Sequence, residues 1–311
     1  MTLPTLDVII VNWNAGALLR RCLAALTEAH APSFTLGRVV VVDNGSSDGS
    51  LDGLDDLVLP LEIMRNASNR GFGAACNQGA AGGTSDYLLF LNPDVYVTAD
   101  SLSVPVAFLG EAAHQDVAAV GIQLRDGHGL VSRSSARVPT VATIFARSLG
   151  LDVLFPRWVP SLFLTEWDHA TTRELEHVIG AFYLVRTRLF VELGGFDERF
   201  FVYLEDLDLS VRIRARGQRI VYLASVSAEH TGGGTSDAIK AQRIAYSLHS
   251  RIQYGYKHFG PWAGTLLAFT TLVIEPVPRL ARALARRSLA ECRDTSVGFA
   301  RLWLRVLSGR R

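Results

Sequence analysis

The tripeptide Asn92-Pro93-Asp94 places a carboxylate at the end of a run of apolar residues. Tyr87–Val95 predicts a buried strand, and the rigid proline would hold the Asp94 side chain at the end of that strand. A divalent cation that binds together with phosphate oxygens needs one or two such carboxylates, and water fills its remaining positions. The same tripeptide is also common in β-turns, and on its own it favours that simpler interpretation.

Asp43 ends a second apolar run, in the segment VVVVDNGSSDGS. A carboxylate at the end of such a strand can accept a hydrogen bond from a nucleobase imide N–H or from a ribose hydroxyl. The residues that follow, Ser46, Ser47 and Asp48, are also typical N-cap residues for a short helix. Both interpretations can hold, because the capping residues lie downstream of Asp43.

Glu205 and Asp206 open a predicted helix, Leu204–Gly217. A carboxylate near an acceptor hydroxyl can remove its proton, which makes this pair a candidate for a general base. The alternative is structural, because acidic residues at a helix N-terminus favour the helix dipole. Asp208 and Arg212 are also spaced to pair on a solvated face of that helix.

Two other segments offer contacts for an anionic ligand. Asn69 and Arg70 precede a helix of small residues, where an arginine can contact a phosphate or a base. This segment is not a dinucleotide-binding fingerprint, because Cys76 stands in place of the third glycine and the segment follows the third predicted strand. His230 precedes a glycine-rich loop and is either a second metal or phosphate ligand or a structural histidine.

A common scaffold for these side chains is visible in the first half of the chain, where apolar runs alternate with helical segments such as Ala15–Ala29. The runs Asp7–Trp13, Arg38–Asp43, Leu61–Asn66 and Tyr87–Val95 predict an α/β fold with a mostly parallel central sheet flanked by helices. Ligands of such sheets bind beyond the carboxyl ends of the strands. We therefore expect one site to contain Asn12, Asp43, Asn69, Arg70, Asn92 and Asp94.

The second half of the chain is less regular. Residues 133–177 have no clear period and predict a variable loop or subdomain. A strand is predicted at His177–Arg186, a second at RIVYL from Arg219, and a helix at Ser236–His258.

The composition excludes several protein classes. A chain of 311 residues with 49% hydrophobic content is neither disordered nor fibrous, and its three cysteines exclude a disulfide framework or a four-cysteine zinc site. The net charge of +1 hides an asymmetry, because 276–311 holds nine arginines and only two acidic residues. The preceding apolar segment, 261–274, is shorter than the roughly 20 residues of a spanning helix. Together they predict a C-terminal helical tail on an anionic membrane surface, or alternatively a basic helix that packs on the core.

The N-terminal residues show no signal peptide, because 1–7 lack basic residues and the apolar run 8–11 is short. We expect a cytoplasmic location, peripheral on the cytoplasmic face of the inner membrane. The body of the chain, 1–275, is mildly acidic and has no nucleic-acid recognition motif, so no nucleic-acid partner is expected.

The motifs in their order resemble family 2 glycosyltransferases of the GT-A fold, in the rhamnosyltransferase-like branch. The matching segments span roughly residues 7–260: VIIVNWN, VVVVDNGSSDGS, NRGFGAACNQG, LLFLNPDV, the Gly-Ala of HVIGAFYLVR, GGFDERFFVYLEDLDLSVRIRARG and the His of AEHTGGGTS. The resemblance implies a transferase domain at 1–260, with a nucleotide-sugar-binding half at 1–116 and an acceptor half at 117–260. A helical tail at 261–311 follows.

The resemblance also implies an activity. It indicates inverting, Mg²⁺- or Mn²⁺-dependent transfer of a sugar from a nucleotide-diphospho-sugar to a glycan or lipid-linked acceptor in cell-envelope polysaccharide synthesis. L-rhamnose from dTDP-L-rhamnose is the best guess for the donor. One departure is that Asn92 replaces the first acid of the family's Asp-x-Asp motif. The implied roles are catalytic base for Asp206, acceptor contact for Glu205, metal ligands for Asp94 and His230, and nucleotide-sugar contacts for Asn12, Asp43, Asn69, Arg70 and Asn92.

Two alternatives remain at this point. A sugar-nucleotide pyrophosphorylase shares the α/β nucleotide-binding design, but the loop NWNAGALL after the first strand lacks the glycine-rich, basic character that such an enzyme needs. A catalytically inactive nucleotide-sugar-binding or scaffold protein is the second alternative, and the presence of Asp94, Asp206 and His230 argues against it.

Overall fold

Alternate residues of the first strands point to opposite faces of one sheet in the computed structural model. In β1 (Thr5–Asn12), Val8 and Ile10 pack in one hydrophobic cluster, whereas Ile9 and Val11 pack in a second cluster. β2 (Thr35–Asp43) and β4 (Tyr87–Leu91) divide their side chains between the two clusters in the same way. Because side chains alternate along a strand and both faces are covered, these strands are apolar at nearly every position.

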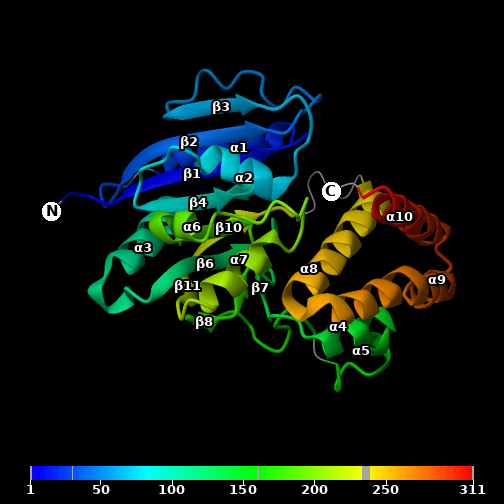
Figure 1. Cartoon of the computed structure of the whole chain (residues 1–311). Coiled ribbons are helices and arrows are strands. Elements are labelled where there is room, and N and C mark those ends of the chain that lie inside the picture. Colours follow the sequence, from blue (N-terminus) through cyan, green and yellow to red (C-terminus); the bar gives the residue numbers. More distant parts are fainter. Residues whose placement is uncertain (1, 30, 160, 233–238, 310–311) are drawn as a thin grey trace. The chain divides into compact units, whose positions relative to one another are not determined.

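Helices cover both faces of this sheet (Figure 1). Helices α1 (Ala17–Glu28) and α3 (Ala99–Gly110) contribute to the first cluster, and a short 3₁₀ turn, η1 (Ala112–His114), follows α3. The second cluster receives side chains from α2 (Phe72–Ala80), α6 (Thr187–Glu192) and α7 (Glu205–Arg214). The predicted α/β architecture is therefore confirmed.

The sheet is parallel in its first half and mixed in its second half. Its order is β3-β2-β1-β4-β10-β6-β11-β5, and β3 (Leu61–Arg65), β2, β1 and β4 run parallel. Antiparallel β10 (Phe182–Arg186) lies between β4 and β6 (Val117–Arg125). Strand β11 (Arg219–His230) is parallel to β6 and antiparallel to β5 (Val95–Tyr96) and to β8 (Arg173–Leu175).

Strand β11 contains an irregularity that changes the direction of its side chains. Leu223 pairs with Ile122, but the next residue of β6, Gln123, pairs with Ser227, so three residues of β11 have no partner on β6. Before this point Val221 and Leu223 pack in the first cluster, and after it Ala228 does so. An odd number of extra residues thus exchanges the faces of odd- and even-numbered side chains.

Three of the predicted strand boundaries were wrong. The predicted strand at 177–186 is divided into β9 (His177–Val178) and β10, because β9 pairs with β7 (Ser135–Ala136) in a separate small sheet while β10 joins the main sheet. The strand at 87–95 is divided by a turn at Asn92. β11 continues beyond RIVYL to His230, so this histidine lies at a strand end, and residues 233–238 of the glycine-rich loop lie outside the described residues.

The structure describes residues 2–29, 31–159, 161–232 and 239–309. The chain divides into two compact units, the first comprising Met1–Arg137, Phe163–Asp197 and Asp206–Thr235, and the second Val138–Leu162, Glu198–Glu205 and Ser236–Arg311. The first unit contains the sheets and the helices named so far, except that Glu205, the first residue of α7, belongs to the second unit.

The second unit is helical. It contains α4 (Val141–Ser148), α5 (Leu151–Leu154), α8 (Lys240–Phe269), the π-helical turn η3 (Thr270–Ile274), α9 (Pro276–Ala285) and α10 (Leu289–Leu307). A small core joins α8 to α10 through Leu248, Ile252, Phe299 and Leu302. The helix predicted at Ser236–His258 extends to Phe269, and its direction changes at Gly260, whose φ of +81° suits glycine. Within the described ranges, no helix is long and apolar enough to cross a membrane.

An ion cluster is buried in this helical unit. Glu275 is 2% exposed and pairs with Arg251 and, at 2.8 Å, with Arg279. Arg251 also donates to Thr271 at 3.0 Å, and its burial lowers the pKa of its guanidinium although the charge of Glu275 opposes that shift. Because the Arg251 and Glu275 charges are both shielded from water, each is stabilised by pairing with the other.

Replacing Glu275 with glutamine leaves Arg251 as an uncompensated buried charge. We expect Glu275→Gln to lower the free energy of unfolding by about 3–5 kcal/mol, measured by urea denaturation. The control is Glu291→Gln, which removes an exposed pair with Arg286 at 3.7 Å and should cost about 0–1 kcal/mol. Equal effects of the two variants would contradict the role of Glu275.

Candidate active site

Asn12 and Asp43 face each other where β1 and β2 end. The Asn12 side-chain amide donates to Asp43 Oδ1 at 2.8 Å and to Ser50 Oγ at 2.7 Å. The backbone N–H of Ser46 donates to Asp43 Oδ2 at 3.2 Å. Asn12 is fully buried and Asp43 nearly so, so the amide fixes the direction of the carboxylate.

The polar loop after Asp43 also has the capping character that the sequence indicates. Asp48 accepts hydrogen bonds from the backbone N–H groups of Ser50 at 3.0 Å and Gly16 at 2.7 Å. Desolvation opposes the shift, but these hydrogen bonds lower the pKa of Asp48. The loop is thus organised locally and leaves Asp43 at the strand end.

Asn69 and Arg70 lie in the turn that begins α2. The side chain of Asn69 accepts from the N–H of Gly71 at 2.8 Å, and the Asn44 side chain donates to the carbonyl of Gly71 at 3.1 Å. The Arg70 guanidinium is exposed and donates to the Gln78 side chain of α2 at 3.2 Å. Gly71 adopts a φ of +93°, so glycine permits this turn. Asn69 shapes the loop, and Arg70 is accessible to a ligand.

Asp94 and His230 come together across the β5–β11 pair. Val95, the neighbour of Asp94, pairs with His230, and the N–H of Thr231 donates to the Asp94 carbonyl at 3.2 Å. Asp94 Oδ2 lies 3.4 Å from His230 Nε2, and both side chains are more than four-fifths buried. The sequence reasoning paired these residues as metal ligands, and the structure brings them together over a separation of 136 positions.

The Asn92-Pro93-Asp94 segment is also the turn that the simpler interpretation proposes. The N–H of Val95 donates to the Asn92 carbonyl at 3.1 Å, which closes a four-residue turn. The backbone N–H of Asn92 donates to the carbonyl of Ala181 at 3.0 Å. The turn is therefore held by backbone atoms of Asn92 and Val95, and its hydrogen bonds do not use the Asp94 carboxylate.

Asp206 is joined to this turn through only two residues. Its Oδ2 accepts from the backbone N–H of Gly180 at 2.7 Å, and the next residue, Ala181, accepts from Asn92. The turn that contains Asp94 and the Asp206 side chain, 112 positions away, therefore both bond to one Gly180–Ala181 segment. Both lie in the first compact unit.

The backbone before α7 is strained. Tyr203 and Leu204 both have φ of +68°, a left-handed conformation that costs a non-glycine residue about 1–2 kcal/mol. Such strain clusters at functional sites, where it directs a side chain. It directly precedes Glu205, which is buried, and Asp206, which keeps 18% of its side chain exposed.

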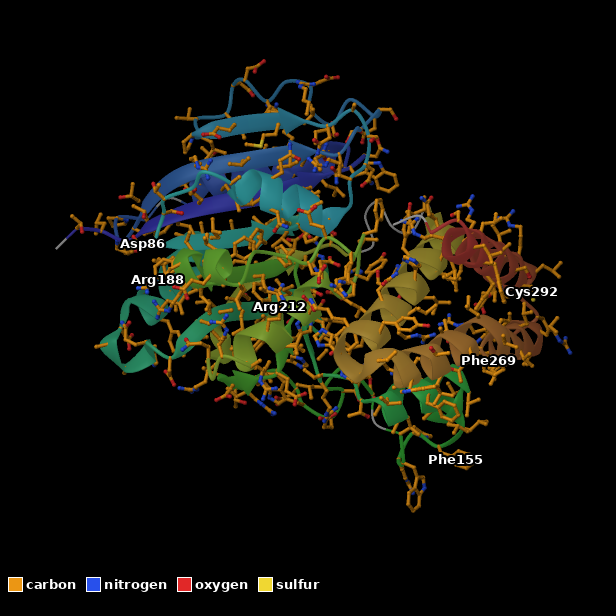
Figure 2. All side chains as sticks on the ribbon, in the orientation of Figure 1. Asp86, Phe155, Arg188, Arg212, Phe269 and Cys292 are labelled. Atoms are coloured by element: carbon orange, nitrogen blue, oxygen red, sulfur yellow. The ribbon has the colours of Figure 1, made fainter. Side chains whose placement is uncertain are left out.

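The pair Asp208–Arg212 forms as predicted, but not on a solvated face. Arg212, labelled on α7 in Figure 2, donates to Asp208 Oδ2 at 2.8 Å and to the carbonyls of Leu193 and Gly195. Asp208 is fully buried, so the expectation of a solvated pair was wrong. The pair anchors α7 to the loop after α6.

The sequence reasoning missed His177, whose Nε2 lies 3.7 Å from Asp206 Oδ2. A polar, titratable residue just before the Gly-Ala motif was the available signal. This signal was overlooked because the apolar residues of His177–Arg186 predict a single strand, in which His177 is only the first residue.

Asp94 and His230 can hold a divalent cation only with additional ligands. Within the ranges that the structure describes, no group of three or more His, Cys, Asp or Glu side chains could hold a metal ion. One carboxylate with one imidazole fits an Mg²⁺ or Mn²⁺ ion whose other ligands come from a phosphate and water.

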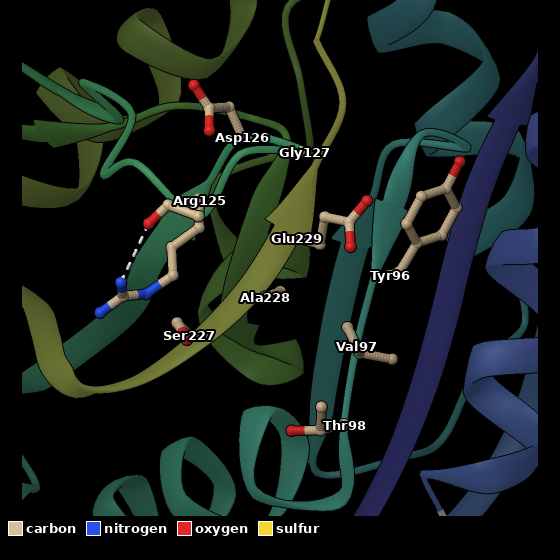
Figure 3. Close-up of a pocket in the computed structure, with 10 residues that line it drawn as sticks. Tyr96, Val97, Thr98, Arg125, Asp126, Gly127, Ser227, Ala228 and Glu229 are labelled. Carbon is tan, nitrogen blue, oxygen red and sulfur yellow. Dashed lines mark hydrogen bonds between the residues drawn. The ribbon is translucent and has the colours of Figure 1, made fainter.

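An open pocket lies beside these strands (Figure 3). Its lining includes Tyr96, Thr98, Arg125, Asp126 and Glu229. Tyr96 and Glu229 form the pair of the β5–β11 ladder that is next to Val95 and His230. None of the predicted site residues lines this pocket.

The model of the glycosyl transferase family 2 matches residues 7–194. An N-acetylglucosaminyl-diphospho-decaprenol L-rhamnosyltransferase of Mycobacterium tuberculosis is 29% identical over 84% of this chain and 87% of its own length. The rhamnosyltransferase WbbL of Escherichia coli is 24% identical over 54% of this chain and 61% of its own length. These matches confirm the resemblance to family 2 and to its rhamnosyltransferases.

The fold is shared with a solved glycosyltransferase. The mannosyltransferase PcManGT from Pyrobaculum calidifontis, in complex with GDP-Man and Mn²⁺, aligns with a TM-score of 0.58 at 17% identity, over 100% of this chain and 89% of that chain. This confirms the GT-A architecture. With the family model matching more than half of its residues, the chain belongs to glycosyl transferase family 2 and is a glycosyltransferase.

Proposed function

We propose that the protein is an inverting, metal-dependent transferase that moves L-rhamnose from dTDP-L-rhamnose to a lipid-linked saccharide during cell-envelope polysaccharide synthesis. The observation that carries the proposal is the Gly180–Ala181 link between the Asp94 turn and Asp206. This link supports the proposal that Asp94, as a cation ligand, and Asp206, as a base, act on one bound donor. The rhamnosyltransferase relatives support the choice of sugar.

The donor would bind across the carboxyl ends of β1, β2 and β4. Asp43, held by Asn12, would accept from the base or ribose, and the exposed Arg70 would contact the diphosphate. Asn69 would shape the loop that presents Arg70, and Asn92 would contact the ribose or a metal-bound water.

Asp94 and His230 would hold Mg²⁺ or Mn²⁺ against the diphosphate. When bound, the cation supplies positive charge that stabilises the leaving diphosphate. Because Asn92 replaces an acid, this chain offers a single carboxylate at that place, and its ligand set carries one negative charge fewer than a pair of aspartates.

Asp206 would act as the general base. Its carboxylate takes the proton of the acceptor hydroxyl while that oxygen forms a bond to the anomeric carbon and the bond from this carbon to the diphosphate oxygen breaks. One displacement from the opposite face inverts the configuration and needs no covalent intermediate. Glu205, the neighbour of Asp206 in the chain, is proposed to contact the acceptor.

The helical unit supports a membrane-bound acceptor. Trp262, Leu266 and Phe269 follow helical spacing and expose 89%, 46% and 54% of their surfaces (Phe269 is labelled in Figure 2). Arg286 and Arg287 are exposed farther along the chain. An apolar stripe with nearby arginines is typical of a helix that lies in an anionic membrane surface. We propose peripheral binding to the cytoplasmic face of the inner membrane.

A screen of purified protein against dTDP-, UDP- and GDP-sugars tests the enzymatic proposal. In the presence of Mn²⁺ or Mg²⁺ and a polyprenyl-diphosphate-linked sugar as acceptor, we expect nucleoside diphosphate to be released fastest from dTDP-L-rhamnose. A metal chelator should stop this release. Asp206→Asn should lower kcat by about 10²–10⁴-fold with little change in donor affinity, because only the proton acceptor is lost. Asp94→Ala should lose metal and donor binding together.

The matched control is Asp55→Asn, which alters an exposed carboxylate of the first unit and should retain full activity. Normal turnover by Asp206→Asn would remove the base assignment. Donor binding without turnover by the wild type would favour an inactive binding protein, and formation of a nucleoside triphosphate from donor and pyrophosphate would favour a pyrophosphorylase.

A vesicle flotation assay tests the membrane proposal. The wild type should bind vesicles of phosphatidylglycerol more strongly than vesicles of phosphatidylcholine, and high salt should weaken this binding. Changing both Trp262 and Phe269 to serine should weaken it about tenfold or more, because two large apolar side chains no longer enter the interface. The control, Val58→Ser, changes an exposed residue of the first unit and should bind like the wild type. Unchanged binding by the double variant would refute the stripe as the contact surface.

A further inference from the structure

A chain of buried polar side chains lies behind Asp206. The hydroxyl of Tyr183 is 3.0 Å from Ser210 Oγ, which is 3.0 Å from His177 Nδ1, and His177 Nε2 faces Asp206 Oδ2 at 3.7 Å. Tyr183 and Ser210 are fully buried and His177 is 4% exposed. These residues come from β10, α7 and β9, so three separate elements meet behind one carboxylate.

The direction of the hydrogen bonds follows from the donors available. A tyrosine hydroxyl has one proton, and among the described residues Ser210 is the partner that the Tyr183 hydroxyl contacts. If Tyr183 donates to Ser210, then Ser210 donates to His177 Nδ1, and a neutral imidazole must carry its proton on Nε2. The reverse direction would leave the buried Tyr183 proton without an acceptor and turn an imidazole lone pair toward the carboxylate.

The charge state of the histidine agrees with this assignment. Burial lowers the pKa of His177, although the negative charge of Asp206 opposes the shift. Burial likewise raises the pKa of the Tyr183 hydroxyl, so it keeps its proton. The groups that face this cluster are Asp206 and Ser210 from α7 and Tyr183 from β10. Arg212, whose charge also acts on Tyr183, is paired with Asp208.

We propose that His177 is a positioning residue for the general base: its Nε2–H and the backbone N–H of Gly180 together occupy Asp206 Oδ2. The N–H of Leu207 contacts Oδ1 at 2.8 Å, which leaves one lone pair of Oδ1 for the acceptor hydroxyl. At 3.7 Å the imidazole contact is electrostatic and weaker than a full hydrogen bond. It orients the carboxylate toward the acceptor hydroxyl. The inference rests on the proposed transfer reaction.

A matched pair of variants isolates the N–H group. His177→Leu removes it, whereas His177→Gln can offer an amide N–H at a similar reach. We expect His177→Leu to lower kcat about tenfold, equivalent to about 1.4 kcal/mol, with the donor KM within twofold of the wild type. The acid limb of its kcat–pH profile should move to higher pH, because losing an N–H that faces the carboxylate favours the protonated acid. His177→Gln should restore kcat to within threefold and return the limb to its wild-type position.

Thermal unfolding and affinity for the nucleoside diphosphate serve as folding controls for both variants. Equal kcat values and equal pH profiles for the leucine and glutamine variants would overturn the assignment. An inactive wild type would instead overturn the proposed function, and the positioning role would fall with it.

A measurement on the unmodified protein keeps the inference testable if His177→Leu fails to fold. Long-range ¹⁵N–¹H correlation spectra, with His177 assigned through His177→Gln, should show a neutral imidazole with its proton on Nε2 between pH 6 and 8. A proton on Nδ1, or an imidazolium in this range, would overturn the inference. Ser210→Ala should remove the tautomer preference, because Nδ1 then loses its donor.

Discussion

The Gly180–Ala181 segment is the constraint on which the active-site geometry depends. The N–H of Gly180 donates to the Asp206 carboxylate, and the carbonyl of Ala181 accepts from the backbone N–H of Asn92. A side chain at position 180 would place its Cβ 3.3 Å from Asp206 Oδ2, so glycine allows the carboxylate this close approach. The segment also lies between β9 and β10: the Gly180 N–H serves the Asp206 side chain, whereas the Ala181 carbonyl extends the pairing of β10 with β4 by one residue. The end of one strand pair is thus joined to the Asp206 carboxylate.

The electrostatics on the two sides of this segment differ. On the Asp94 side, the chain offers one carboxylate and one imidazole, a set that needs anionic phosphate to complete a cation's coordination. On the Asp206 side, the carboxylate contacts the His177 imidazole and backbone N–H groups rather than a permanent cation. An arginine or lysine paired with Asp206 would make it a poorer proton acceptor. The surroundings of Asp206 are therefore suited to a base, whereas those of Asp208, paired with Arg212, are suited to structure.

The sequence was sufficient to predict the parts of the fold that depend on local pattern. The apolar runs gave the parallel strands, and the rule that ligands bind at their carboxyl ends gathered Asn12, Asp43 and Asp94. Long-range pairing could not be read in this way. That His230 reaches Asp94 depends on β5 and β11 forming a pair, and β5 is only two residues long. His177 was missed because its partners, Tyr183 and Ser210, lie on other elements and have no fixed spacing from it. The solvated position assigned to Asp208 was wrong because helical spacing reveals the Arg212 partner but not what covers both residues.

The irregularity in β11 has a consequence for how this chain can change in length. The three residues between Leu223 and Ser227 reverse the alternation of the strand, and His230 faces Asp94 only with that reversal in place. A deletion or insertion of one residue there would turn the histidine to the other side of the sheet even if every strand still formed. A change of two residues would preserve its side. Homologous chains that keep this histidine beside the aspartate should therefore differ in this stretch by even numbers of residues.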